Sequence, residues 1–183
     1  MKRTFQPGLL IAIFLLNVFA TAATAQSTSD TPPRYKDVVV ENPTAEADMK
    51  VVGDFVNALT AGELDKAKSL LAEKYKGYGP GPLDSGTVEQ TINSWKESNK
   101  VQLNRKVSFV TQTFRVLQGD LKGNWVSVWG DYSFTQDGKN VAFPFQYTAR
   151  VTDGKIDTDR VYYDRMYIMQ TLGYKVTPPE KAK

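Results

Sequence analysis

The sequence of 183 residues contains no histidine and no cysteine. Without histidine there can be no Ser-His-Asp triad, and without cysteine there can be no thiol nucleophile and no disulfide. The two absences together exclude a zinc site built from Cys and His ligands. Any acid–base chemistry would therefore depend on Asp, Glu, Lys, Tyr or a bound water molecule.

Long apolar runs are also scarce, and the one at the N-terminus is typical of a targeting signal. LLIAIFLLNVFA, from Leu9 to Ala20, follows a start that contains Lys2 and Arg3 and precedes the small-residue sequence Ala23-Thr24-Ala25. Roughly 12 apolar residues are too few to span a bilayer, which takes ~20. We therefore expect residues 1–25 to be a cleaved signal peptide, with a membrane anchor as the alternative. The mature protein would be periplasmic or secreted and would have no membrane association.

Charge of one sign is not concentrated anywhere in the chain. Cleavage after residue 25 would remove two basic residues and no acidic one, which lowers the net charge from +3 to +1. Nucleic-acid binding is therefore not expected, because it depends on clustered positive charge. In an exported chain without disulfides, stability must come from packing.

The sequence predicts one domain, at residues 44–176, between a flexible leader at 26–43 and a frayed tail at 177–183. Three valines at 38–40 could form a short strand, although an extended arm is the preferred interpretation. Asn42-Pro43 resembles a helix start. Apolar residues at helical spacing then predict a helix that ends at Gly62.

Two further helices precede a change to strand periodicity. Residues 63–75 are predicted as a second helix, and Thr87 to Gln90 matches the capping box that starts a third. Strands are predicted at about 105–118, 124–136, 139–152 and 155–163. Asp137-Gly138 and Asp153-Gly154 mark hairpin turns between them. Residues 165–172 are predicted as a short closing helix. The fold class is therefore α+β, with three helices packed on a curled antiparallel sheet of four long strands.

Four local motifs resemble the SnoaL-like branch of the nuclear transport factor 2-like superfamily. They are the ALTAGELD link that begins at Ala58, the Tyr78-Gly79-Pro80 loop, the Asp153-Gly154-Lys155-Ile156 hairpin, and the closing pattern from Tyr162 to Gly173. The resemblance covers about residues 45–174. It implies a cone-shaped domain with an internal pocket, often a dimer through the sheet face. Members include cyclases, isomerases and non-enzymatic domains, so the fold does not fix the function.

The resemblance also suggests catalytic candidates. In SnoaL-type cyclases an aspartate near the last strand acts as acid–base catalyst, and Asp164 lies in the matching pattern with Asp159 as the nearby alternative. Asp164 could instead cap the closing helix. Tyr147 lies roughly where ketosteroid isomerases have a hydrogen-bond donor to an oxyanion. The histidine of the cyclases and the acidic base of the isomerases are both missing.

Strand alternation predicts an aromatic pocket. Phe143, Phe145 and Tyr147 share one face of their strand, and Asp159 shares a face with Tyr163 on the next. The expected ligand-binding residues are Phe55, Tyr78, Trp95, Phe143, Phe145, Tyr147 and Tyr163. Core or interface packing is the alternative for these rings. Asp153, Asp157 and Asp159 lack the spacing of a calcium loop, so they are predicted to be solvated turn and strand charges. No metal and no cofactor are expected.

These observations favour an exported domain that binds an apolar or aromatic small molecule and forms a homodimer, with no demonstrated catalysis. The first alternative is a cyclase- or isomerase-like enzyme with an Asp acid–base group and a Tyr donor. The second is a non-enzymatic interaction module that dimerises through Trp125, Trp129 and their neighbours.

Overall fold

A computed structural model describes residues 34–175 and residue 177. The predicted signal peptide and nearly all of the predicted tail lie outside these residues. The chain from Tyr35 onward forms one compact unit. None of the helices in the described part of the chain combines the length and apolar character needed to cross a bilayer.

The described residues of this unit form seven strands and five helices. The helices are α2 (Tyr35–Val38), α3 (Ala45–Ala61), α4 (Leu64–Ser69), α5 (Val88–Val101) and α6 (Arg165–Thr171). The strands are β1 (Val39–Val40), β2 (Leu71–Tyr78), β3 (Ser85–Gly86), β4 (Leu103–Val116), β5 (Gly123–Gln136), β6 (Lys139–Thr152) and β7 (Lys155–Tyr163). They form one sheet in the order β1-β4-β5-β6-β7-β2-β3.

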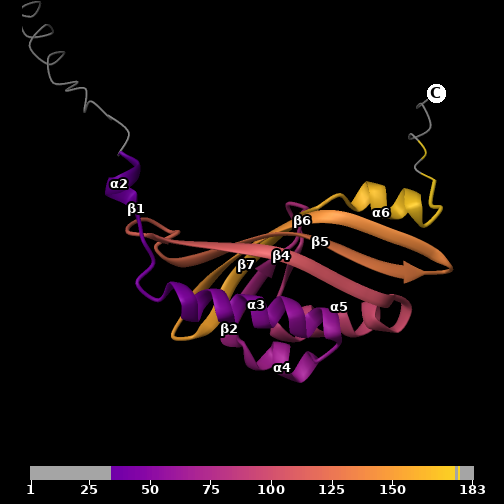
Figure 1. Cartoon of the computed structure of the whole chain (residues 1–183), viewed down its shortest axis with the longest axis horizontal. Coiled ribbons are helices and arrows are strands. Elements are labelled where there is room, and N and C mark those ends of the chain that lie inside the picture. Colours follow the sequence, from indigo (N-terminus) through magenta and orange to yellow (C-terminus); the bar gives the residue numbers. More distant parts are fainter. Residues whose placement is uncertain (1–33, 176, 178–183) are drawn as a thin grey trace, which may run out of the picture. The chain divides into compact units, whose positions relative to one another are not determined.

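The four long strands confirm the predicted meander. Strands β4 to β7 pair antiparallel with their sequence neighbours. Both Asp-Gly turns have positive φ at the aspartate and at the glycine, as a tight hairpin turn requires. The sheet is curled and does not close into a barrel. Helices α3, α4 and α5 lie together on one side of the long strands (Figure 1).

The prediction of the second helix was wrong over nearly half of its length, from residue 70 to residue 75. Helix α4 ends at Ser69, and residues 71–78 form β2, which pairs in parallel with β7. Because of this pair, the sheet is mixed and not purely antiparallel. The preferred interpretation of residues 36–41 as an unpaired arm was also wrong, because β1 pairs with β4.

Asn42 does not cap the first long helix as predicted. The helix begins at Ala45, with Thr44 as its N-cap residue. The buried Asn42 side chain accepts a hydrogen bond from the Thr44 amide at 3.0 Å and donates one to Asp48 at 2.9 Å. The capping box at the start of α5 is present as predicted.

The core lies between α3 and the inner face of the sheet. Val52 and Phe55 of α3 are almost fully buried against Val126 and Val128 of β5. The valines of β5 therefore point inward, and its tryptophans lie on the opposite face. A second cluster of Tyr132, Phe134, Val141 and Phe143 lies toward the other end of the sheet, where Ile168 of α6 packs against it.

Candidate functional site

A cavity of about 610 Å³ opens on the inner face of the sheet. Such a volume lies within the range of pockets that hold small molecules. Its walls come from α3, α5 and α6 and from strands β2, β4, β5, β6 and β7. The 79–86 segment also contributes, so the site combines residues that are more than 100 positions apart in sequence.

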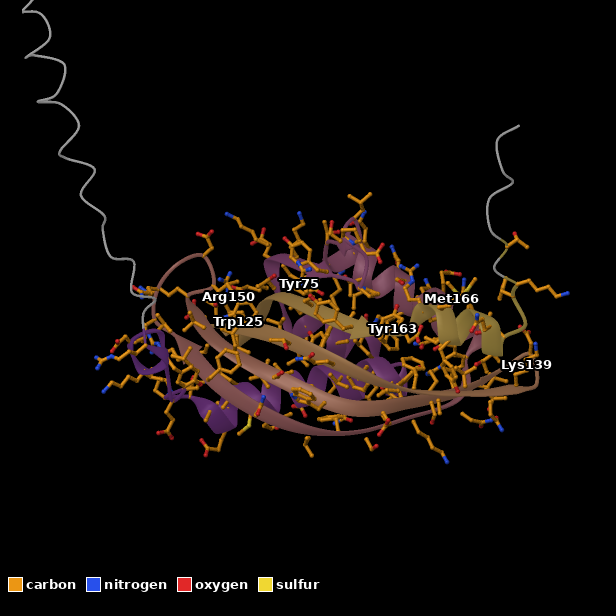
Figure 2. All side chains as sticks on the ribbon, turned by 90° about the horizontal axis from the view of Figure 1, so that it is seen from above. Tyr75, Trp125, Lys139, Arg150, Tyr163 and Met166 are labelled. Carbon is orange, nitrogen blue, oxygen red and sulfur yellow. The ribbon has the colours of Figure 1, made fainter. Side chains whose placement is uncertain are left out.

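All seven residues predicted to contact a ligand line this cavity. They are Phe55, Tyr78, Trp95, Phe143, Phe145, Tyr147 and Tyr163. Of the two alternating sets on β6, the one predicted to face inward does so: Phe143 and Tyr147 are buried, and Phe145 is half-buried. Tyr163 comes from β7 and lies close to the start of α6, where Met166 is labelled in Figure 2.

The polar centre of the cavity is Asp159 on β7. Its side chain is 5% exposed. The Oδ2 atom accepts hydrogen bonds from the Tyr75 and Tyr147 hydroxyls, each at 2.7 Å. The backbone N–H of Tyr78 also donates to this carboxylate. We call Asp159, Tyr75 and Tyr147 the Asp–Tyr cluster.

Burial changes the protonation of this cluster. The pKa of Asp159 is raised to about 6 because burial penalises the charged carboxylate more than the three hydrogen bonds stabilise it. The pKa values of Tyr75 and Tyr147 are raised, first by burial and then by the nearby Asp159 charge. The tyrosines therefore keep their protons at neutral pH. The Asp159 carboxyl loses its proton near pH 6, just below neutral pH.

The prediction that Asp159 is a solvated strand charge was therefore wrong. It alternates with Val161 and Tyr163 on the inner face of β7, and all three line the cavity. Its neighbour Asp157 points elsewhere and accepts a hydrogen bond from Arg150 at 2.9 Å. In the described chain, no group of three carboxylates is placed to hold a metal ion.

The first catalytic candidate, Asp164, lies outside the cavity. Its exposed side chain accepts a hydrogen bond from the Tyr167 amide at 2.9 Å and caps α6. This arrangement is the capping alternative that the sequence offered. Asp164 is therefore not among the residues that line the cavity, whereas its alternative, Asp159, is.

Sequence reasoning missed Tyr75 because it placed this residue at the end of a helix. In strand β2, Tyr75 and Gly77 alternate on the face that lines the cavity. A Cβ atom at Gly77 would lie 2.2 Å from the Tyr75 hydroxyl and 3.0 Å from the Oδ1 atom of Asp159. Glycine at this position therefore permits the close approach of Tyr75 to Asp159. The local sequence gave no signal for this position, because LAEKYKGY has no regular alternation of apolar and polar residues.

Aromatic contacts surround the cluster and continue along the cavity. The Phe55 ring stacks on the Tyr147 ring with centroids 6.1 Å apart. The Tyr132 ring makes T-shaped contacts with Trp95 and Phe143, with ring centroids 6.0 and 5.7 Å apart. The Tyr132 hydroxyl donates to the Gln102 side chain at 3.0 Å, and burial raises its pKa to about 12. The long wall of the cavity is thus apolar and aromatic.

The mouth carries one ion pair. Arg165 at the start of α6 contacts Asp84 of the 79–86 segment at 2.6 Å. Both side chains are largely exposed, so this pair contributes little to stability.

The curled sheet, the helices on its inner face and the cavity between them define a domain with the nuclear transport factor 2-like fold. No family model matches the sequence, and a search of curated proteins found no relative. Solved structures do match. A nuclear transport factor 2-like protein from Burkholderia xenovorans has 16% identity and a TM-score of 0.53, and the match covers 69% of this chain and 96% of that chain. The fold part of the family resemblance is therefore confirmed.

Two further structural neighbours are an enzyme and a protein solved with a small molecule. A LEH-like epoxide hydrolase of Mycobacterium tuberculosis has 18% identity and a TM-score of 0.55, over 71% of this chain and 92% of that chain. A protein from Catenulispora acidiphila with a ketosteroid isomerase-like fold, solved with trimethylamine, has 19% identity and a TM-score of 0.56, over 70% and 98%. At these identities the likeness shows the fold.

Proposed function

We propose that this protein binds a small, largely apolar molecule in the cavity and holds the molecule's polar group against the Asp–Tyr cluster. The observation that carries the proposal is the combination of an aromatic-lined cavity of about 610 Å³ with a buried carboxylate as its polar centre. Pockets for small molecules typically have apolar walls and a few placed polar groups. The trimethylamine complex of a neighbour supports small-molecule binding by this fold.

The test is a thermal-shift titration with 3-phenylpropan-1-ol, which has one ring and one hydroxyl group. Binding to the folded state raises the melting temperature as the ligand concentration rises above the dissociation constant. Ser94 lies on α5 at the cavity wall, and Ser94→Trp would fill part of the space. Asn93 is the adjacent exposed residue and does not line the cavity, so Asn93→Trp is the matched control.

The proposal expects a shift in the wild type and in Asn93→Trp, and a smaller shift in Ser94→Trp. Equal shifts in all three proteins would place the binding elsewhere. No shift for this probe or for a broader set of apolar compounds would remove the proposal.

A second candidate function is general acid–base catalysis by Asp159. The observation that favours it is the carboxyl pKa of about 6, because a group that titrates near neutral pH exchanges protons efficiently. The epoxide hydrolase and the proposed polyketide cyclases among the structural neighbours add support from the fold. Hydrolysis of styrene oxide to its diol is a direct assay. Turnover lost in Asp159→Asn and kept in Asp164→Asn would support the candidate, whereas no turnover above background or equal rates would count against it.

The partner we propose is a second copy of this chain, bound through the outer face of the sheet. A row of four paired residues crosses this face, with one residue from each of β4, β5, β6 and β7. In that order they are Val110, Trp129, Gln146 and Tyr162. The three apolar members of this row are 69%, 52% and 48% exposed. An apolar row of this kind favours association. Trp125 is less available, because Arg150 lies over its ring (Figure 2).

Sedimentation equilibrium would show this dimer. We expect the wild type to be dimeric and Trp129→Lys to shift toward monomer, while Trp125→Lys has a smaller effect. A wild-type monomer at high concentration would overturn the dimer.

Export is the localisation we propose, on the basis of the signal-like residues 1–25. N-terminal sequencing of the protein from a periplasmic or culture fraction should begin at Gln26. An uncleaved N-terminus in a membrane fraction would favour the anchor.

A further inference from the structure

The hydrogen bonds within the Asp–Tyr cluster determine what kind of polar group it can receive. A tyrosine hydroxyl has one proton, and the protons of Tyr75 and Tyr147 both go to Oδ2 of Asp159. The Thr91 side chain of α5 is a further hydrogen-bond partner of the Tyr75 hydroxyl. What remains for a ligand is lone pairs on the phenol oxygens and on the carboxylate. The cluster therefore accepts hydrogen bonds and has no free donor for a carbonyl or an oxyanion.

The charged residues of the cavity favour one class among the ligands that can donate a hydrogen bond. The charged residues that line it are Asp84, Asp159 and Arg165. Asp84 and Arg165 pair with each other at the mouth. The ion pairs found among the described residues do not include Asp159. An ionised, buried carboxylate without a cation is costly, and a ligand cation would offset that cost.

Aromatic rings extend this preference along the cavity. Tyr147 of the cluster stacks with Phe55, and Tyr132, Phe143 and Tyr163 continue the wall. The face of an aromatic ring attracts a cation, most strongly where water is excluded. A carboxylate with aromatic rings around it suits an alkylammonium group, whose charge meets the carboxylate while its carbon atoms meet the rings.

We propose that the ligand of this cavity is an apolar amine, bound as its ammonium ion at Asp159. The inference rests on the proposed function and specifies its ligand class. It goes against the oxyanion role suggested for Tyr147, because that role needs a tyrosine proton that is already donated to Asp159.

The pH dependence follows from the groups that face Asp159. These are Tyr75 from β2 and Tyr147 from β6, whose pKa values are both raised, while α3 and α5 contribute the neutral Phe55 and Thr91 nearby. The pKa of Asp159 is raised to about 6, so the carboxylate is ionised at pH 8. A primary amine, with a pKa near that of lysine at about 10.4, is still protonated there. At pH 5 about one carboxyl in ten is ionised, so amine affinity should fall about tenfold.

The experiment compares three probes of matched shape by calorimetry on the full chain. They are 3-phenylpropylamine, 3-phenylpropan-1-ol and 3-phenylpropanoate, which carry a cation, a neutral donor and an anion. At pH 8 we expect the amine to bind about tenfold more tightly than the alcohol, and the carboxylate most weakly. At pH 5 the advantage of the amine over the alcohol should be lost.

Two variants locate the effect. Asp159→Asn should lose the preference for the amine over the alcohol, since an amide is neutral and does not attract the ammonium charge. Tyr147→Phe removes one hydroxyl donor that lowers the pKa of Asp159, so the amine preference should be lost at a higher pH than in the wild type. This variant provides the test if Asp159→Asn does not fold.

The outcomes separate the two claims. If amine and alcohol bind with equal affinity at pH 8, the amine inference fails and the proposed function stands. A preference for the amine that persists in Asp159→Asn or at pH 5 also overturns the inference, because the cation then binds elsewhere. If none of the probes binds at millimolar concentration, the proposed function fails and the inference fails with it.

Discussion

Asp159 should make the stability of this protein fall as the pH rises from about 4 to about 6. The pKa of the carboxyl is about 6 in the folded chain, against the ordinary aspartate value of 3.8 expected in the unfolded chain. The folded state thus binds a proton more tightly, and in this window it holds more protons than the unfolded state. Stability therefore decreases with increasing pH, the reverse of the usual effect of a salt-bridged aspartate.

The size of this effect follows from the difference between the two pKa values. A difference of about 2 units corresponds to about 3 kcal/mol over the whole window. Because Asp159 is almost fully buried, solvent screening reduces this figure little. About 2 kcal/mol of the loss should occur between pH 4.5 and pH 7.

The assay is urea denaturation of the wild type, Asp159→Asn and Asp164→Asn at pH 4.5 and pH 7. The amide at position 159 cannot titrate, so the free energy of unfolding of the wild type minus that of Asp159→Asn should drop by about 2 kcal/mol between the two pH values. Asp164→Asn, altered at the exposed cap, should follow the wild type. Parallel pH dependence of the wild type and Asp159→Asn would refute the account of this carboxyl as a buried, high-pKa group.

Three other substitutions test the packing around the site. Gly77→Ala should displace the Tyr75 hydroxyl and abolish probe binding in calorimetry, whereas Gly53→Ala, whose Cβ meets its nearest neighbour at 3.7 Å, should bind normally. Asp164→Ala should lower the free energy of unfolding by about 1 kcal/mol through loss of the α6 cap, and it should leave probe affinity unchanged. A large loss of probe affinity would mean that Asp164 belongs to the binding site. Gly130→Ala should cost about 1–3 kcal/mol in urea denaturation, because its Cβ would lie 2.3 Å from a backbone oxygen, and a neutral result would contradict that contact.

Sequence alone could predict the meander because its signals are local. The Asp-Gly pairs determine two hairpins, and alternation along β6 determines which side chains face inward. The capping box likewise placed the start of α5. Each of these features is decided within a few residues of chain, so a single sequence contains the information.

Strand β2 could not be predicted in the same way. Its sequence, LAEKYKGY, has no regular alternation and includes good helix formers. It becomes a strand because it pairs with β7, in a register where Gly77 is opposite Asp159. Tyr75 enters the site through this long-range pairing, so missing the strand meant missing the tyrosine.

The choice between Asp159 and Asp164 depended on two competing principles. The family pattern pointed to Asp164, but an aspartate directly before a helix finds a ready donor in the backbone amide three residues on. Asp159 shares its face with Val161 and Tyr163, and that alternation placed it inside. The family motif pointed to the exposed Asp164, whereas the alternation of side chains along the strand identified the buried Asp159.

The most direct test of the central claim is the carbon-13 NMR signal of the Asp159 carboxyl during titration with 3-phenylpropan-1-ol and with 3-phenylpropylamine. The account predicts that this signal shifts and saturates at the dissociation constant measured by calorimetry, because the ligand's polar group lies against the Asp–Tyr cluster. A carboxyl signal that stays unchanged while either probe binds would contradict the account.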